Sequence, residues 1–358
     1  MPNVSEIIRA EIGQNGPISF ARFMELALYC PGSGFYEKET DTPGRTGDFY
    51  TSVSTGNVFG HLLAFQFSGW LAQMPSSKPL LIVEAGAHDG RLAADILEWF
   101  GAQLAEFLPR LEYWIVEPSA QRQVWQRERL LKFGNIVHWA AKLADVPGGV
   151  TGIIFSNELL DAMPIRRFAW DARQCTWHER GVGVDREKFV WVHLPGRATV
   201  QDLPPDLLEV LPDGFTIEVS PAAIQWWREA ADVLRSGKLL TLDYGFAGEG
   251  FLTPARKDGT VRAYRRHQLV NDVLADPGEQ DLTAHVDFTA VQRAGEAAGL
   301  RTELFQSQSA FLTGIARQAW TEGSRFGEWT QNHTRQFQTL THPDHLGRAF
   351  RVLVQKRH

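Results

Sequence analysis

The stretch Leu80-Leu81-Ile82-Val83-Glu84-Ala85-Gly86-Ala87-His88-Asp89-Gly90-Arg91-Leu92-Ala93-Ala94-Asp95-Ile96-Leu97 predicts a strand, a tight turn and a helix. It opens with a short apolar run containing Ile and Val, as a buried parallel strand does. Gly86 and Gly90 mark the turn, and Leu92 and Ile96 then recur at helical spacing. In an open α/β sheet, such a turn places backbone N–H groups and a helix N-terminus beside a ligand-binding crevice.

The glycine spacing in this turn argues against a dinucleotide fold. The dinucleotide fingerprint is G-x-G-x-x-G, whereas this turn reads G-x-x-x-G with His88 in the middle. Glu84 precedes the first glycine, and an acid there is typical of S-adenosylmethionine (SAM) methyltransferases. It can accept a hydrogen bond from the ammonium group of SAM. We expect Gly86 and Ala87 to face the cofactor, and Gly90 to let the helix pack closely on the strand. An ordinary turn without a ligand is the alternative.

Composition limits the function classes. The 358 residues, 44% of them hydrophobic, suffice for one elaborated α/β domain or two domains. A net charge of -6 argues against broad binding to nucleic acid or anionic membranes, and no apolar run approaches the ~20 residues of a membrane helix. Cys30 and Cys175 make neither a disulfide framework nor a metal motif. With no secretory signal pattern at the N-terminus, we expect a cytoplasmic protein without a metal site.

Strands and helices alternate after residue 79. Apolar runs predict the strands, and apolar residues at helical spacing predict the helices between them. This alternation is typical of a doubly wound, parallel, Rossmann-like α/β sheet. The predicted strands are 80–85, 113–118, 136–139, 151–158, 238–245, 304–308 and 350–355, and the predicted helices include 90–103, 119–131, 221–234, 288–298 and 310–337.

Two insertions interrupt the predicted core, which we place at residues 79–358 after an N-terminal region of residues 1–78. Residues 165–195 alternate between apolar and polar side chains and are separated by turn residues, so they predict an inserted antiparallel β meander. Residues 247–283 are polar and predict a long loop. The basic residues between 256 and 267 are expected to be solvated, with contact to an acidic partner as the alternative.

The N-terminal region is predicted to contain helices and a lid. Two helices are expected in residues 1–30, with Ser19 capping the second. A long loop follows, and its segment 47–52 is a candidate lid over the site. We expect Tyr50 and Thr51 to contact the cofactor. The alternative is a structural Ω-loop packed by its own aromatic residues.

Polar residues end several predicted strands. Glu117 follows the second strand, where an acid hydrogen-bonds ribose hydroxyls in nucleotide-binding sheets. Asn157, Glu158 and Asp161 follow a later strand, where the methyl acceptor would enter. Two nearby acids suit a guanidinium, because carboxylates pair with it through two hydrogen bonds. We therefore take Asn157, Glu158 and Asp161 as catalytic candidates and Glu84, Glu117 and Asn157 as cofactor ligands. Solvated carboxylates, or a helix-start acid at Asp161, are the alternatives.

Many of these stretches together resemble the MidA family of SAM-dependent methyltransferases. The resemblance spans residues 18 to 300 and implies SAM as cofactor, a helical N-terminal region and a meander inserted in a methyltransferase core. Mitochondrial members are complex I assembly factors that methylate an arginine of a respiratory-chain subunit. The sequence departs from the family at Ala87-His88-Asp89, where a glycine is usual. Matching pieces include Gly47-Asp48-Phe49-Tyr50-Thr51, Glu84-Ala85-Gly86-Ala87, Glu117-Pro118, Asn157-Glu158-Leu159-Leu160-Asp161, Asp243-Tyr244-Gly245, Gly259-Thr260-Val261-Arg262 and Asp281-Leu282-Thr283-Ala284-His285.

The leading hypothesis is a SAM-dependent methyltransferase that acts on an arginine of a partner protein. One alternative is a non-catalytic, SAM-binding assembly factor that uses the same fold. The other is a nicotinamide-dependent oxidoreductase, which the missing dinucleotide fingerprint disfavours. The oligomeric state is left open by the sequence.

Overall fold

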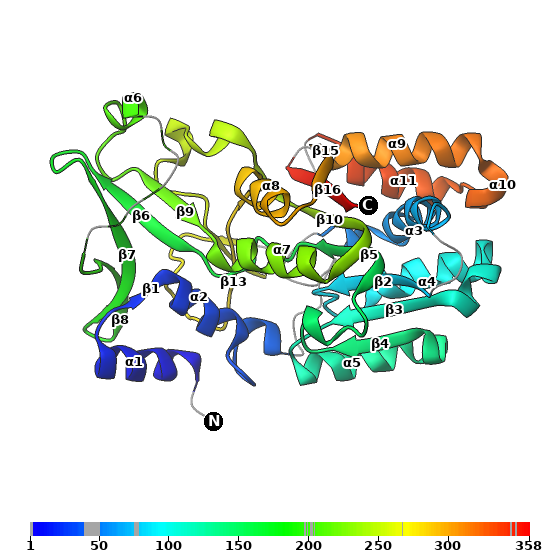
Figure 1. Cartoon of the computed structure of the whole chain (residues 1–358). Coiled ribbons are helices and arrows are strands. Elements are labelled where there is room, and N and C mark those ends of the chain that lie inside the picture. Colours follow the sequence, from blue (N-terminus) through cyan, green and yellow to red (C-terminus); the bar gives the residue numbers. More distant parts are fainter. Residues whose placement is uncertain are drawn as a thin grey trace. The chain divides into compact units, whose positions relative to one another are not determined.

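The chain forms two compact units, and their helices and strands are labelled in Figure 1. The first contains Met1–Asp41, Asp161–Gln225 and Phe246–Thr289, and the second contains Thr42–Leu160, Trp226–Gly245 and Ala290–His358. Both sequence insertions therefore belong to the first unit, together with the N-terminal helices. The computed structural model describes residues 3–38, 51–74, 79–196, 198, 200, 203, 205–266, 268–343, 346–347 and 349–358.

A large sheet organises the second unit and confirms the predicted α/β class. Its strand order is β15-β16-β10-β5-β2-β3-β4. The five strands from β10 to β4 are parallel, as predicted. The exception is β16, which is antiparallel to both β10 and β15. The strands are β2 (Leu80–Ala85), β3 (Leu111–Val116), β4 (Val137–Ala140), β5 (Val150–Asn157), β10 (Leu234–Phe246), β15 (Arg301–Ser307) and β16 (Phe350–Arg357).

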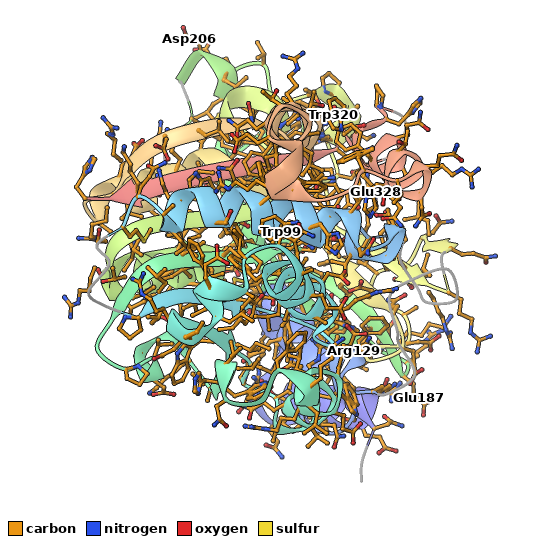
Figure 2. The ribbon with its side chains drawn as sticks, turned by 90° about the vertical axis from the view of Figure 1, so that its right-hand side faces the viewer. Trp99, Arg129, Glu187, Asp206, Trp320 and Glu328 are labelled. Atoms are coloured by element: carbon orange, nitrogen blue, oxygen red, sulfur yellow. The ribbon has the colours of Figure 1, made fainter. Side chains whose placement is uncertain are left out.

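Helices of the second unit bury apolar faces against the sheet and one another. Helix α3 packs on α4, α9 and α11. Trp99 of α4, labelled in Figure 2, is buried and donates its indole N–H to the carbonyl of Phe326 at 3.0 Å. The predicted helix 310–337 is broken twice: at Glu322, whose ψ of 43° is not helical, and at Gly327, whose φ of +96° a helix cannot contain. The helices are α3 (Val58–Leu71), α4 (Arg91–Gln103), α5 (Ala120–Leu130), α9 (Gln308–Thr321), α10 (Gly323–Phe326) and α11 (Gln331–Thr341).

The first unit contains the predicted antiparallel meander. Strands β6 (Arg166–Asp171), β7 (Thr176–Asp185) and β8 (Lys188–His193) follow one another, and β9 (Thr216–Val219) pairs with β6. A short strand, β1 (Ile18–Ser19), pairs with β7. The helices α1 (Val4–Asn15) and α2 (Phe20–Tyr29) fall where the sequence predicted them. The hydroxyl of Ser19 accepts the backbone N–H of Arg22, which confirms the predicted cap.

The predicted long loop 247–283 is wrong in part, because it contains a small antiparallel sheet. Its strands are β11 (Arg262–Arg265), β12 (Gln268–Val270) and β13 (Asp281–Thr283), in the order β12-β11-β13. Arg262 and Arg265 on β11 are exposed, as predicted for the basic stretch, whereas Arg256 is half-buried with its guanidinium over the ring of Phe246. The strands are short and half polar, which hid them in a polar stretch. His267 lies outside the described residues.

The remaining helices are α6 (Pro205–Leu208), α7 (Pro221–Val233) and α8 (Phe288–Ala297), with a two-residue strand, β14 (Val286–Asp287), before the last. Among the described residues, no helix combines the length and the apolar character needed to cross a membrane.

Candidate functional site

The large sheet has a topological switch point at β2. From β2 the chain adds β3 and β4 on one side and β5 and β10 on the other. Open α/β sheets bind ligands outside the carboxyl ends of their strands at such a point. Because β2, β3 and β5 are parallel neighbours, the residues after them share one edge. We call this the switch-point edge: the turns 86–90 and 157–160, together with Glu117.

Two turns of the switch-point edge touch each other. Gly86 has a φ of +72°, and a Cβ added there would lie 2.9 Å from Cδ1 of Leu159. A side chain at position 86 would therefore strain the backbone and push the second turn away. Gly86 is half-buried and Ala87 is buried, so their expected contact with a cofactor stays a prediction.

His88 occupies a backbone conformation that glycine usually supplies. Its φ is +49°, at a cost of about 1 kcal/mol. The N–H of Gly90 donates to the carbonyl of Ala87 at 2.7 Å, and Arg129, labelled in Figure 2, pairs with Asp89 at 2.8 Å. Burial lowers the pKa of His88, so its imidazole is neutral near pH 7.

Glu84 is a buried acid on β2, with only 3% of its surface exposed. The hydroxyl of Tyr113 on β3 donates to its Oε2 at 2.6 Å. Burial raises the pKa of Glu84 to about 8, because an ionised carboxylate loses its hydration there. The alternative of a solvated surface carboxylate is therefore wrong for Glu84, while its role toward the ammonium of SAM stays a prediction.

Glu117 follows β3 and is 4% exposed, so it is not a solvated acid either. Its Oε1 accepts the backbone N–H of Ser119 at 2.9 Å, and its Oε2 accepts Nε2 of Gln126 at 3.2 Å. These donors fix the orientation of the carboxylate. The sequence analysis did not identify Gln126. Its position four residues before Leu130, on the same helix face, indicated that this amide is buried.

Asn157 and Glu158 form the other side of the switch-point edge. Nδ2 of Asn157 donates to Oε1 of Glu158 at 3.0 Å, and the N–H of Glu158 donates to the carbonyl of Leu242 at 2.9 Å. Glu158 has a φ of +51°, which a non-glycine residue rarely adopts. Within the described part of the chain, Oδ1 of Asn157 is buried without a hydrogen-bond partner. An orphaned acceptor costs ~1–3 kcal/mol, so a donor group on a ligand fits this position.

A second residue that sequence reasoning missed holds the turn after β5. Asp243 of β10 is fully buried, and its Oδ2 accepts the backbone N–H groups of Leu159 at 3.2 Å and Leu160 at 2.8 Å. Its Oδ1 accepts the N–H of Tyr244 at 2.8 Å. Asp243 thus fixes the backbone that carries Glu158. A lone acid at the end of a buried strand, already quoted for the family resemblance, was its signal.

The remaining predicted site residues are Asp161, Thr51 and Tyr50. Asp161 belongs to the first unit, is 5% exposed and accepts the N–H of Ala284 through its carbonyl at 2.9 Å. No helix starts there in the described chain, so the helix-start alternative is wrong. Thr51 forms a local turn in which its Oγ1 accepts the N–H of Ser54 at 3.1 Å. Tyr50 and the rest of the candidate lid before it lie outside the described residues.

The hydrogen-bond acceptors of the switch-point edge fit an organic cofactor with a positive charge and hydroxyl groups. These acceptors are the oriented carboxylate of Glu117 and the orphaned Oδ1 of Asn157. Among the residues that the structure describes, no group of three or more His, Cys, Asp or Glu side chains could hold a metal ion.

Comparisons with known proteins agree with this geometry. Residues 62–306 match a family described as "Putative S-adenosyl-L-methionine-dependent methyltransferase". The chain is 32% identical to protein arginine methyltransferase NDUFAF7, mitochondrial, from Danio rerio, over 80% of this chain and 70% of that protein. The human protein of that name is 30% identical over 80% and 67%. A crystal structure from Burkholderia thailandensis, bound to S-adenosyl-homocysteine, is 31% identical with a TM-score of 0.84, covering 99% of this chain and 92% of that one.

These relatives contradict the predicted cytoplasmic location, because their names place them in mitochondria. The prediction rested on a missing secretory pattern. A mitochondrial leader is amphipathic and Arg-rich rather than apolar, so the missing pattern had no bearing on it.

Proposed function

The chain belongs to the family of SAM-dependent methyltransferases, and we propose that it transfers the methyl group to an arginine side chain of a partner protein. The proposal takes the acceptor from the names of the relatives, which are protein arginine methyltransferases. The observation that carries it is Glu158, an acid held in a rare left-handed conformation at the switch-point edge. Strained non-glycine residues of this kind cluster at active sites.

We propose that Glu117, Gly86 and Ala87 hold the nucleoside part of SAM. Glu117 would accept the ribose hydroxyls, since its carboxylate is already oriented by Ser119 and Gln126. Asn157 and Glu84 would face the methionine part, with Oδ1 of Asn157 accepting a hydrogen bond from the ammonium group. Gly90 would support the turn, and Tyr50 and Thr51 would close over the cofactor.

The acceptor chemistry requires a carboxylate near the reacting nitrogen. A guanidinium stays protonated near neutral pH, because its pKa lies above about 12. When bound, SAM supplies a methyl group that is electrophilic because it is carried on a sulfonium. We propose that Glu158 accepts N–H groups of the guanidinium, localises its charge on the other nitrogens and takes up the proton that leaves the methylated nitrogen. Asn157 would orient Glu158, and Asp161 would assist.

The test pairs the purified protein with labelled SAM and a lysate, followed by identification of the labelled residue. We expect label on arginine. The Glu158→Gln variant should keep its affinity for S-adenosyl-homocysteine within about twofold and lose at least ~10²-fold in transfer, the usual scale for a positioned catalytic group. Glu128→Gln, which changes an exposed acid on α5, is the matched control.

Two results would count against the proposal separately. Label on a carboxylate, a thiol or a small molecule would remove arginine as the acceptor. Full activity in Glu158→Gln would remove the role of Glu158 and leave the acceptor assignment intact.

A further inference from the structure

Helix α5 turns one polar side chain fully inward. Gln126 is 0% exposed, and Leu130 is the other buried residue that the structure describes on this helix. Burying an amide costs hydration, and fixing a Gln side chain costs rotamer entropy. Such a residue persists inside a fold only when its hydrogen bonds offset these costs.

The amide of Gln126 joins three parts of the sheet edge. Its Nε2 donates to the carbonyl of His88 at 2.9 Å and to Oε2 of Glu117 at 3.2 Å. Its Oε1 accepts the indole N–H of Trp139 on β4 at 3.0 Å. An indole nitrogen can only donate, so Trp139 fixes which end of the amide faces Glu117. The Trp139 ring is itself covered by the guanidinium of Arg127, 4.1 Å from its centroid.

We propose that Gln126 is a positioning residue that couples the left-handed turn at His88 to the carboxylate of Glu117, and so sets the affinity for the cofactor. The inference rests on the cofactor site of the proposed function. Anchoring the carbonyl of His88 stabilises a backbone conformation that His does not favour. The same NH₂ group holds the Glu117 carboxylate in one orientation. Loss of the amide therefore loosens both strand ends at once.

Titration of the purified full chain with S-adenosyl-homocysteine tests the coupling. Gln126→Met keeps an unbranched side chain of similar length but removes all three hydrogen bonds, and we expect the Kd to rise at least ~10-fold. Gln121→Met, an exposed position on the same helix, is the matched control and should leave the Kd unchanged.

A second variant tests the positioning role through the pH dependence of ligand binding, which a merely structural role would not change. Gln126→Glu places a carboxylate against Glu117 and the carbonyl of His88. We expect binding at least ~10-fold weaker than wild type at pH 8, with recovery toward pH 6 as the new carboxyl takes up a proton and donates again. The wild-type titration over the same pH range supplies the baseline.

A stability measurement without ligand tests the proposed link between Gln126 and the turn at His88. In a double-mutant cycle with His88→Gly, the stability loss caused by Gln126→Met should shrink, because glycine needs less support in the left-handed turn.

Several outcomes would overturn the coupling. These are a Kd within twofold of wild type for both Gln126 variants, or a Gln126→Glu deficit that is the same at every pH. If Gln126→Met does not fold, Trp139→Phe removes the N–H that orients the amide, and unchanged affinity there would also overturn it. A wild-type protein that binds no S-adenosyl-homocysteine would remove the cofactor site itself, a result distinct from normal binding in all variants.

Discussion

Two regions of this protein bury charged side chains, and they differ in how fully the buried polar groups are hydrogen-bonded. In the first unit, Arg167 and Glu218 form an ion pair of 3.1 Å with side chains 5% and 7% exposed. Glu218 also accepts the N–H and hydroxyl of Thr260, both at 2.6 Å, and the N–H of Val261 at 3.2 Å. The guanidinium of Arg167 lies 4.6 Å from the ring centroid of Trp191. Because its hydrogen bonds are all made within the protein, the ion pair stabilises the packing of β6, β9 and the segment before β11.

The switch-point edge in the second unit keeps its polar groups less satisfied. Oδ1 of Asn157 is buried and has no partner within the described chain. On β2, the strand that leads into this edge, burial holds the pKa of Glu84 far above that of a solvated acid. The ion pair of the first unit is thus fully satisfied within the protein, whereas the unpartnered Oδ1 of Asn157 would be satisfied by a donor group on a ligand.

The largest expected effect is on the architectural pair. Arg167→Met leaves Glu218 buried without its counter-charge and should lower the free energy of unfolding by about 3–5 kcal/mol. Affinity for S-adenosyl-homocysteine should not change under conditions where the variant is folded. Urea denaturation and titration calorimetry measure the two quantities.

Arg166→Met is the control for that variant. Arg166 pairs with Glu179 but is 46% exposed, so the loss should stay below about 1 kcal/mol. An equal loss in both variants, or weaker ligand binding in Arg167→Met, would break the distinction between the two regions.

The next effect is on binding at the switch-point edge. Glu117→Ala should weaken SAM binding by one to two orders of magnitude, roughly 1.4–2.8 kcal/mol, if both ribose hydroxyls lose their acceptor. Calorimetric titration measures the loss. Glu112→Ala, on the same strand β3 and half-buried, should bind normally. Unchanged affinity in Glu117→Ala would mean that the acid serves the fold alone.

A pH profile isolates Glu84. Its pKa in the folded protein, about 8, lies above the 4.5 of an unperturbed glutamate, so its contribution to stability is full below pH 4.5. That contribution is lost as the pH rises toward 8, with a slope of up to about 1.4 kcal/mol per pH unit. Glu84→Gln should lack this slope in urea denaturation. Parallel profiles for wild type and variant would show that Glu84 titrates as a solvated acid.

The smallest effect is expected at His88. Glycine adopts positive φ without steric cost, so His88→Gly should leave stability unchanged or raise it by up to about 1 kcal/mol. Affinity for SAM should be kept or improved. A large loss of affinity would show that the imidazole itself contacts the ligand, and would move His88 into the binding machinery.

Much of the site could be predicted because its residues follow one another closely in the sequence. The strand 80–85 has the predicted bounds, and its apolar run, the following glycines and the helix after them are all within one short segment. Glu84 and Glu117 were found for the same reason, since each is the first acid at the end of an apolar run. Gln126 and Asp243 were missed because their partners are far away in the sequence.

By itself the sequence determined the alternation of strands and helices, the capped helix at Ser19 and the inserted meander, because side-chain periods and caps depend on neighbours a few residues apart. The tertiary structure alone decided that β16 enters the sheet antiparallel, between β10 and β15. It also decided that the polar stretch 247–283 contains a sheet and that one buried amide spans three strand ends. Pairings of this kind depend on which distant segments meet, and the cost of leaving buried polar groups unpaired selects among them only once the chain has folded.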